Sequence, residues 1–351
     1  MKILMLVNWK INYLDSEDEL IQSPDKVVKG EPYWFFKYFK EKHEVDVVGI
    51  KTTPDWIYDF EKNKLHFYLR QPFSMWGKSE KYDLIISHGS QSSLFLSILR
   101  RIKSNKNTRH LLIDVGCMNG GRESGLSLKL VKLAGHKLDG IIYHASIQKG
   151  YYERYLSWLK EKSFFIPFGT ETGYYFPNSK IKEEPFVLAY GAIKRDYETL
   201  IKAAKSLPQI QFKIIGLIDL PFEVPPNVEL IPFMAVDKLR DYIWRSRLVV
   251  IPLPVFNYAY GQMTLLQSMA CKKAVVVTKT PSTIDYIEDN KTGIFVKPYD
   301  VSDMKEKIER VWNDEKLRKM LALSGSESVK AQFNEELMGL KVEEVIEKIM
   351  K

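Results

Sequence analysis

The stretch AYGQMTLLQSMACKKAVVVTKTPSTIDYIEDNKTGIFVKPYD, residues 259–300, decides the fold class. It predicts a polar loop, a short helix after Gly261, a buried strand over 274–278, a turn at Gly293 and a strand over 294–296. Apolar strands that alternate with helices are typical of parallel sheets covered on both faces. A glycine at a helix start also lets the backbone N–H groups approach an anion such as a diphosphate.

The same alternation runs through the whole chain in two sets of about six strands. Two sets predict two doubly wound α/β domains rather than one large sheet. Pro, Gly and charged residues gather at 166–185, which places the linker there. The predicted strands are 3–7, 45–48, 84–87, 111–113, 141–143 and 164–166, then 187–190, 212–215, 228–230, 248–251, 274–278 and 294–296.

Length and composition are those of a globular protein of two ordinary domains: 351 residues, 45% hydrophobic and 27% charged. The two cysteines, Cys117 and Cys271, stand in unrelated contexts and indicate neither a disulfide framework nor a zinc site. A reducing, cytoplasmic setting is therefore expected. The N-terminal MKILMLVNW is too short for a signal-peptide core, and no apolar run approaches the roughly 20 residues that span a bilayer.

Most of the net charge of +8 lies in the first half, because residues 1–170 hold 26 Lys and Arg against 19 Asp and Glu. A generally basic proteome would explain this, and so would an anionic partner such as a phospholipid surface. The helix predicted within 93–110 carries Arg100, Arg101 and Lys103 beside an apolar face. It is expected either to lie on the inner face of an anionic membrane or to pack in the core with a solvated end. No nucleic-acid-binding module is recognised.

The 259–300 stretch resembles the donor-binding signature of the retaining glycosyltransferases of family 4. The resemblance rests on SMACKKAVVVT, IDYIEDNKTGIFVKPYD and the spacing between them. It implies a GT-B architecture, with two Rossmann-like domains facing a central cleft: 1–170 for the acceptor, 171–335 for the nucleotide sugar, and a helix over 336–351 that returns to the first domain. It also implies transfer of a hexose from a UDP- or GDP-sugar to a lipid-linked, polysaccharide or other glycan hydroxyl, with retention and without a metal or cofactor.

Two carboxylates of the family signature are replaced in this chain. The family has two Glu residues separated by seven, and their positions hold Ala259 and Gln267. The resemblance implies that Gln267 accepts hydrogen bonds from the ribose, since an amide keeps an acceptor oxygen without the charge. Gln262 or Thr264 would replace the first Glu at the sugar. The donor-binding set at this helix is therefore Gly261, Gln262, Met263, Thr264 and Gln267.

The segment LAYGAIKRDYETL, residues 188–200, supplies the cations expected at the diphosphate. Gly191 matches a glycine of the family, the adjacent Arg position holds Ala192, and Lys194 and Arg195 follow. A cation near a helix start opposes the helix dipole, so Arg195 is either an ordinary surface cation or one that pairs with an anion. The resemblance favours the second interpretation and makes Arg195 a catalytic and donor-binding residue beside Gly191 and Lys194.

In the first half, the resemblance points to residues that follow strands. His88 comes directly after the strand 84–87, where the family has a His that contacts the transferred sugar. Asp114 follows the next strand and is expected to bind an acceptor hydroxyl. Gly30 matches one of two glycines near the donor diphosphate, and Glu31 replaces the other.

Two alternatives remain open at this point. The loss of both Glu residues would fit a sugar-nucleotide-binding partner protein without transferase activity. An inverting transferase of the same fold would need a general base in the first half, such as Asp114 or His88.

Overall fold

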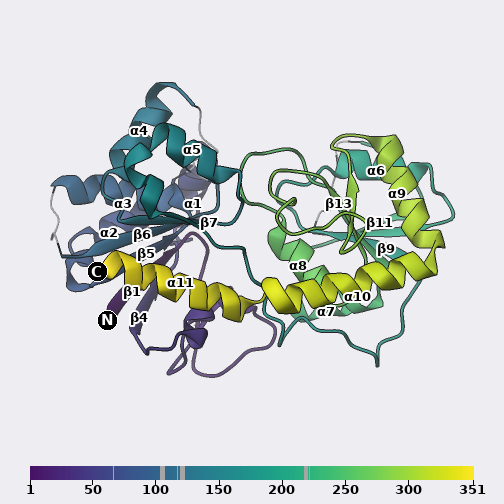
Figure 1. Ribbon diagram of the computed structural model, residues 1–351, viewed down its shortest axis with the longest axis horizontal. Coiled ribbons are helices and arrows are strands. Elements are labelled where there is room, and N and C mark those ends of the chain that lie inside the picture. The colour runs from purple at the N-terminus through teal and green to yellow at the C-terminus, as the bar shows by residue number, and fades with distance from the viewer. Residues whose placement is uncertain (66, 103–106, 117, 119–122, 217–219, 221) are drawn as a thin grey trace. The chain divides into compact units, whose positions relative to one another are not determined.

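The computed structural model describes residues 1–65, 67–102, 107–116, 118, 123–216, 220 and 222–351 (Figure 1). The chain forms two compact units. The first comprises residues 1–166, 257–259 and 338–351, and the second comprises 167–256 and 260–337. The first and longest segment of the first unit thus ends at Ile166, at the beginning of the Pro- and Gly-rich segment.

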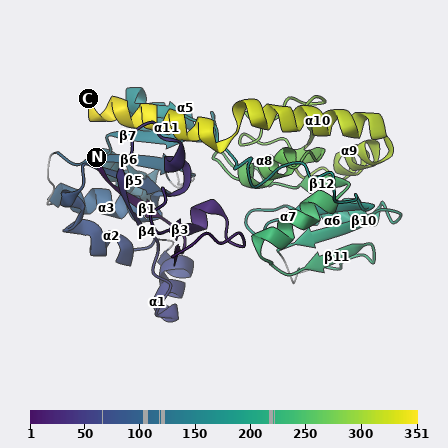
Figure 2. The same ribbon diagram turned by 90° about the horizontal axis from the view of Figure 1, so that it is seen from below.

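A six-stranded parallel sheet in the order β4-β1-β5-β6-β7-β8 forms the centre of the first unit. Helix α3 packs against β5 and β6, α2 packs against α3, and α11 returns to this unit at the C-terminus (Figures 1 and 2). A separate pair of short strands, β2 and β3, lies outside the main sheet. The strands are β1 (Lys2–Val7), β2 (Asn12–Leu14), β3 (Lys26–Val28), β4 (Glu44–Val48), β5 (Leu84–His88), β6 (Arg109–Asp114), β7 (Gly140–Tyr143) and β8 (Ser163–Phe165). The helices are η1 (Ser23–Asp25), η2 (Trp34–Tyr38), α1 (Asp55–Phe60), η3 (Glu61–Leu65), α2 (Arg70–Trp76), η4 (Ser79–Lys81), α3 (Ser90–Ile102), α4 (Gly125–Gly135), α5 (Gln148–Tyr155), η5 (Ser157–Lys162) and α11 (Glu335–Met350).

The second unit repeats the plan with the strand order β11-β10-β9-β12-β13-β14. Helix α6 packs on α9, and α8 packs on α10. The strands are β9 (Phe186–Tyr190), β10 (Gln211–Ile215), β11 (Val228–Ile231), β12 (Leu248–Ile251), β13 (Val275–Thr278) and β14 (Ile294–Val296). The helices are α6 (Tyr197–Lys205), α7 (Val236–Arg245), α8 (Gln262–Ala270), α9 (Val301–Asn313) and α10 (Glu315–Gln332).

Strand β9 shows why these apolar runs form central parallel strands. All five of its residues are buried, and successive side chains enter different cores. Val187 and Ala189 belong to the cluster that includes α6 and α9, whereas Leu188 and Tyr190 belong to the cluster that includes α8. A strand buried on both faces needs helices on both sides of the sheet, which is the doubly wound arrangement.

Each of the twelve strand predictions is confirmed, with ends that differ by at most two residues. The short strands β2 and β3 were not predicted, because three-residue segments such as Asn12–Leu14 carry no apolar run. Within the described residues, no helix combines the length and apolarity that crossing a membrane requires.

Candidate functional site

The start of α8 in the second unit presents unpaired backbone amides. Gly261 precedes the helix with a φ of +79°. A Cβ at this position would lie 2.9 Å from Cδ1 of Leu253, so both the backbone angle and the close packing require glycine. Within the described residues, the amides of Gln262, Met263 and Thr264 have no hydrogen-bond acceptor. Such free N–H groups at a helix start form an anion-binding site.

The loop after β9 brings a guanidinium group to this helix start. Gly191 adopts a φ of +107°, and a Cβ there would lie 2.6 Å from Nη2 of Arg195. Nη2 of Arg195 donates a hydrogen bond of 2.7 Å to Oγ1 of Thr264 in the first turn of α8. The structure therefore brings Gly191 and Arg195, which are neighbours in sequence, together with the distant Thr264.

The Arg195 guanidinium is half-buried and is held by neutral acceptors. Its Nε donates to the carbonyl oxygen of Tyr190 at 3.3 Å, and its Nη1 donates to those of Ile193 and Lys194 at 2.8 and 3.2 Å. In the described part of the chain no carboxylate pairs with it, and one of its five N–H groups has no acceptor. Burial lowers the pKa of Arg195, which marks an uncompensated cation. Such a cation favours an anionic ligand.

Two tyrosines fix the loop against the helix. The hydroxyl of Tyr190 donates to the carbonyl oxygen of Thr264 at 2.9 Å and lies 3.0 Å from Oγ of Ser268. The hydroxyl of Tyr197 donates to the carbonyl oxygen of Gly191 at 2.6 Å. Burial raises the pKa of both phenols. These tyrosines were not predicted as site residues, although Tyr190 ends a strand and so stands where a site residue is expected.

The other predicted donor-site residues lie around the same helix start. Nε2 of Gln262 donates to the carbonyl oxygen of Ser282 at 3.0 Å. Gln267 is buried, and its amide makes no hydrogen bond within the described residues, which leaves it available to a ligand. Met263 is exposed, and Lys194 extends its Nζ to 4.9 Å from the ring centre of Phe256.

A hydroxyl-rich loop after β13 adjoins this site and was missed in the sequence. Thr280, Ser282 and Thr283 are almost fully buried there. Oγ1 of Thr280 lies 2.9 Å from Oγ of Ser282, and Oγ1 of Thr283 donates to the carbonyl oxygen of Thr278 at 2.9 Å. The signal that could have found it is the run TKTPST directly after a strand end. These hydrogen bonds position the acceptor of the Gln262 amide.

In the first unit, His88 ends β5 inside a group of aromatic rings. Its imidazole lies 4.9 Å from the ring of Trp9 and 5.4 Å from that of Trp34. Both ring nitrogens are buried without a hydrogen-bond partner in the described part of the chain. Burial and, to a lesser extent, the charge of His144 lower the pKa of His88 to about 3. The imidazole is therefore neutral near pH 7, able to donate one hydrogen bond and accept another.

Asp114 has a structural role, which corrects the prediction that it contacts an acceptor. The residue is fully buried. Its Oδ1 accepts hydrogen bonds from the amides of Gly116 and Met118 at 3.0 and 3.3 Å, and its Oδ2 accepts one of 2.7 Å from the hydroxyl of Tyr152. The carboxylate is therefore an internal acceptor that holds the turn after β6 and the hydroxyl of Tyr152.

Gly30 lies in an exposed turn after β3 with a φ of +83°. It lines a cavity of about 350 Å³ together with His43 and Val45, at the start of β4. His88, another predicted site residue of this unit, lies at the carboxyl end of β5. No described contact joins Gly30 to His88.

The predicted membrane-facing set also needs correction. Arg100 is buried, and its Nη2 donates to the carbonyl oxygen of Thr108 at 2.5 Å. It therefore cannot meet a membrane surface. Arg101 is exposed and donates to the carbonyl oxygen of Leu133 at 3.3 Å. Lys103 lies outside the described residues.

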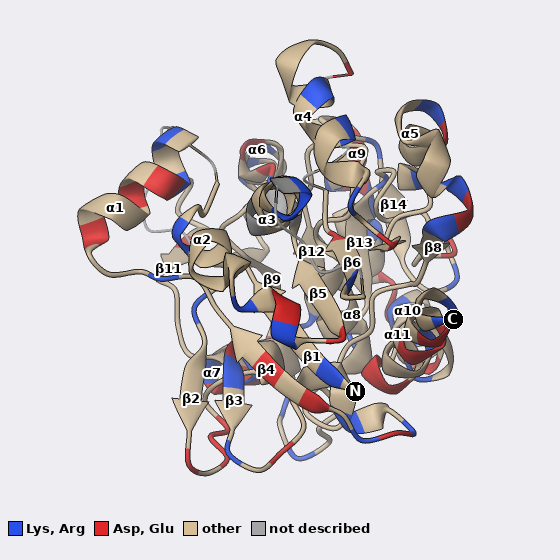
Figure 3. Ribbon diagram, turned by 90° about the vertical axis from the view of Figure 1, so that its left-hand side faces the viewer, with Lys and Arg blue, Asp and Glu red and all other residues tan. Residues whose placement is uncertain are grey.

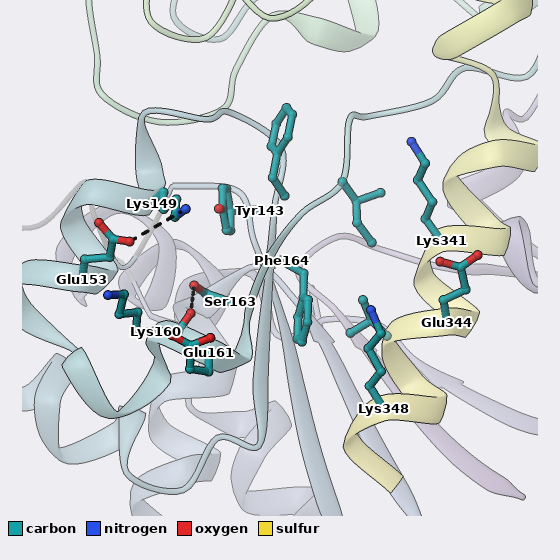
Figure 4. A pocket seen from close by; sticks show the side chains of 13 residues that line it. Tyr143, Lys149, Glu153, Lys160, Glu161, Ser163, Phe164, Lys341, Glu344 and Lys348 are labelled. Atoms are coloured by element: carbon teal, nitrogen blue, oxygen red, sulfur yellow. Dashed lines mark hydrogen bonds and ion pairs between the residues drawn. The ribbon is translucent and has the colours of Figure 1, made fainter. Parts of the chain in front are cut away.

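A cavity of about 570 Å³ opens beside the edge strand β8 (Figure 4). Lysines and glutamates of α5, η5 and α11 surround it, and Nζ of Lys149 lies 3.8 Å from Oε1 of Glu153. Nζ of Lys348 lies 5.7 Å from the ring centre of Phe164. No residue predicted from the sequence lines this cavity, and its mixed charges define no ligand class. Among the described residues, no group of three or more His, Cys, Asp or Glu is placed to hold a metal.

Comparison with known proteins supports a sugar-transferring family. The family model described as glycosyl transferases group 1 matches residues 174–327, which include the whole α8 site. An uncharacterized glycosyltransferase of Methanocaldococcus jannaschii is 25% identical over 260 residues, covering 66% of this chain and 72% of that protein. The capsular polysaccharide biosynthesis glycosyltransferase CapM of Staphylococcus aureus is 24% identical over 221 residues, covering 55% and 57%.

The fold is GT-B, as the sequence predicted. HepE of Anabaena, crystallised in complex with UDP, superimposes with a TM-score of 0.69 over 99% of this chain and 100% of that chain, at 16% identity. That likeness concerns the fold alone. In sequence, this chain is thus similar to the glycosyl transferases of group 1 over residues 174–327 and to curated glycosyltransferases.

Proposed function

We propose that this protein transfers a hexose from a UDP-sugar to a hydroxyl group of a glycan or lipid-linked acceptor, with retention of the anomeric configuration. The observation that carries the donor half is the Arg195 guanidinium, half-buried without a carboxylate partner in the described part of the chain, beside the free amides of α8. The UDP bound to HepE and the capsular role of CapM support the choice of UDP and of a glycan acceptor.

The residues of this site can stabilise a leaving diphosphate without a metal. Negative charge develops on the diphosphate as the bond to the sugar breaks, and oriented N–H groups stabilise charge where it develops. The amides of Gln262, Met263 and Thr264 and the remaining N–H of Arg195 would supply them. Gln267 would accept from the ribose. The neutral imidazole of His88 would hydrogen-bond to a hydroxyl of the transferred sugar.

The retaining pathway that we propose uses the leaving phosphate to help deprotonate the acceptor on the same face of the sugar. The position of Asp114 supports this choice over inversion, because its carboxylate is fully buried and already accepts hydrogen bonds from Gly116, Met118 and Tyr152, whereas a general base must reach the acceptor hydroxyl. Anomeric analysis of the product distinguishes the two outcomes. An inverted product would replace this proposal.

Thermal unfolding with UDP tests the donor site. UDP at millimolar concentration should raise the melting temperature, because a ligand that binds only the folded state stabilises it. Arg195→Ala should remove most of this increment, whereas Arg310→Ala should keep it. Arg310 is an exposed arginine of the same unit that donates to Asn290 at 3.0 Å. The increment is compared, not the melting temperature itself, because Arg195→Ala also loosens the loop. If neither UDP nor GDP raises the melting temperature, the donor-site assignment is rejected.

A second candidate, a sugar-nucleotide-binding protein without turnover, is favoured by one observation. The two positions of the family's glutamates hold the buried apolar Ala259 and the uncharged Gln267. A screen of nucleotide sugars with mass-spectrometric detection of released UDP separates the candidates. Binding without turnover of any donor would select the second one.

A further inference from the structure

Helix α4 of the first unit carries apolar side chains that the core does not use. Val131 and Ala134 on its inner face belong to the core. Leu126, Leu130 and Leu133, at spacings of four and three residues, are 73%, 41% and 37% exposed. Residues spaced in this way share one face of a helix. A helix that only packs on its own domain has a polar outer face, so these leucines need another explanation.

The same outer face is cationic. Lys129 and Lys132 are exposed between the leucines, and neither pairs with a carboxylate within the described residues. Arg101 adds a third charge, because its Nη1 donates to the carbonyl oxygen of Leu133 near the end of the helix. Figure 3 shows the ribbon of α4 in tan and blue, and residues 125–135 contain no Asp or Glu.

The side chains next to α4 extend the apolar and cationic character of its outer face. At its C-terminal end, the ring of His136 stacks on Trp158 with centroids 3.9 Å apart, and Trp158 is 37% exposed. At its N-terminal end, Glu123 accepts a hydrogen bond from Tyr155 and lies 3.9 Å from Nη1 of Arg154, so its charge is already paired. Leucine with lysine on one helix face and a half-exposed tryptophan beside it are typical of surfaces that enter the headgroup region of a bilayer.

We propose that the outer face of α4, formed by Leu126, Leu130, Leu133, Lys129 and Lys132, docks this protein on an anionic lipid bilayer. The leucines would enter the boundary between headgroups and acyl chains, and the lysines with Arg101 would meet the lipid phosphates. A second copy of the chain fits less well, because a two-fold contact through this face would place the lysines of the two copies opposite one another. The proposal stands on this surface alone and does not rest on the transferase assignment.

Cosedimentation with vesicles tests the proposal. Vesicles of phosphatidylglycerol and phosphatidylcholine in equal parts should bind the protein. Its affinity for vesicles of phosphatidylcholine alone should be lower by about tenfold or more. The triple variant Leu126→Gln, Leu130→Gln, Leu133→Gln should lose about tenfold or more of the binding, since three apolar side chains no longer leave water. The matched control is Met320→Gln with Leu323→Gln on α10, where the replaced side chains are 43% and 45% exposed. It should bind like the wild type.

Three results would overturn the proposal: triple-variant binding equal to that of the wild type, equal loss in the α10 control, or no binding to either kind of vesicle. A dimer in analytical ultracentrifugation that the triple variant abolishes would also overturn it, by assigning the face to a second copy. Circular dichroism checks that the triple variant is folded. The UDP-induced rise in melting temperature should be unchanged in it, so failure of the docking surface is distinguishable from failure of the donor site.

Discussion

The buried imidazole of His88 costs stability and is suited to binding a ligand. Its two nitrogens are buried without a partner in the described structure, and an unmet buried polar group costs about 1–3 kcal/mol. Its pKa of about 3 lies below the ordinary value of 6.5. Between these values the unfolded chain binds a proton that the folded protein does not, so acidification through this window lowers the free energy of unfolding. Such costs are retained where a group serves a ligand.

His88→Phe is therefore expected to stabilise the first unit and to make its free energy of unfolding less dependent on pH. A phenyl ring suits the site between Trp9 and Trp34 and needs no hydrogen bond. The extra free energy of unfolding of the variant over the wild type should grow as the pH falls from 7 to 5. Below pH 6.5 it should grow by up to about 1.4 kcal/mol per pH unit. His144, whose pKa burial lowers to about 4, keeps part of the slope in both proteins. Sugar transfer should be lost.

Urea unfolding at pH 7 and pH 5, monitored by amide hydrogen exchange in β5, measures the difference in free energy of unfolding between the variant and the wild type. His136→Phe, next to the C-terminal end of α4, is the control for replacing an exposed histidine by phenylalanine. Equal slopes for His88→Phe and the wild type would show that His88 is not the group that titrates.

At the scale of single elements, the start of α8 depends on Gly261. The variant Gly261→Ala places a methyl group at a φ of +79° and 2.9 Å from Cδ1 of the buried Leu253. Gly125, the first residue of α4, has a φ of +77° with no atom within 4 Å of its Cβ position, so Gly125→Ala carries the backbone strain without the clash. We expect a loss of about 1–2 kcal/mol for Gly125→Ala and about 1–3 kcal/mol more for Gly261→Ala.

Only Gly261→Ala should also weaken UDP binding in isothermal titration, by about tenfold for one misplaced amide hydrogen bond. Equal stability losses in the two variants would mean that Leu253 moves aside without cost. Unchanged UDP affinity would mean that the amides of α8 do not contact the nucleotide.

Elements built from local sequence were predictable, whereas partners distant in sequence were not. The strands follow from short patterns of apolar residues, and so does a local cap such as that of α6, where Oδ1 of Asp196 accepts from the amide of Thr199 three residues later. Asp114 also stands at a strand end, but Tyr152, whose hydroxyl donates a hydrogen bond to its carboxylate, is 38 residues away in the sequence. Arg100 reads as a cationic helix end, yet its guanidinium turns inward to Thr108. Only tertiary packing decides which polar group finds a buried partner.

At the scale of the whole molecule, the chain leaves the second unit after α10 and completes the first with α11. The carboxylate of Glu343 accepts hydrogen bonds from the amides of Lys40 and Glu41 at 3.0 and 3.1 Å. A Cβ on Gly339 would lie 2.7 Å from the carbonyl oxygen of Phe35. The last helix is thus a structural part of the first unit, which the family resemblance implied and local sequence alone could not show.

Gly339→Val should therefore destabilise the first unit selectively. The added side chain meets backbone rather than a flexible side chain, so α11 must shift, at an expected cost of about 1–3 kcal/mol. Hydrogen exchange with mass spectrometry should show faster exchange in β1, β4 and η2 and unchanged exchange in β9 and β12. Asp314→Ala is the matched control, because it removes the cap that accepts from the amide of Leu317 at 2.9 Å and should affect only α10 and its neighbours. If Gly339→Val instead loosened the strands of the second unit to the same degree, α11 would have to stabilise both units, and the division of the chain at residue 338 would not describe its energetics.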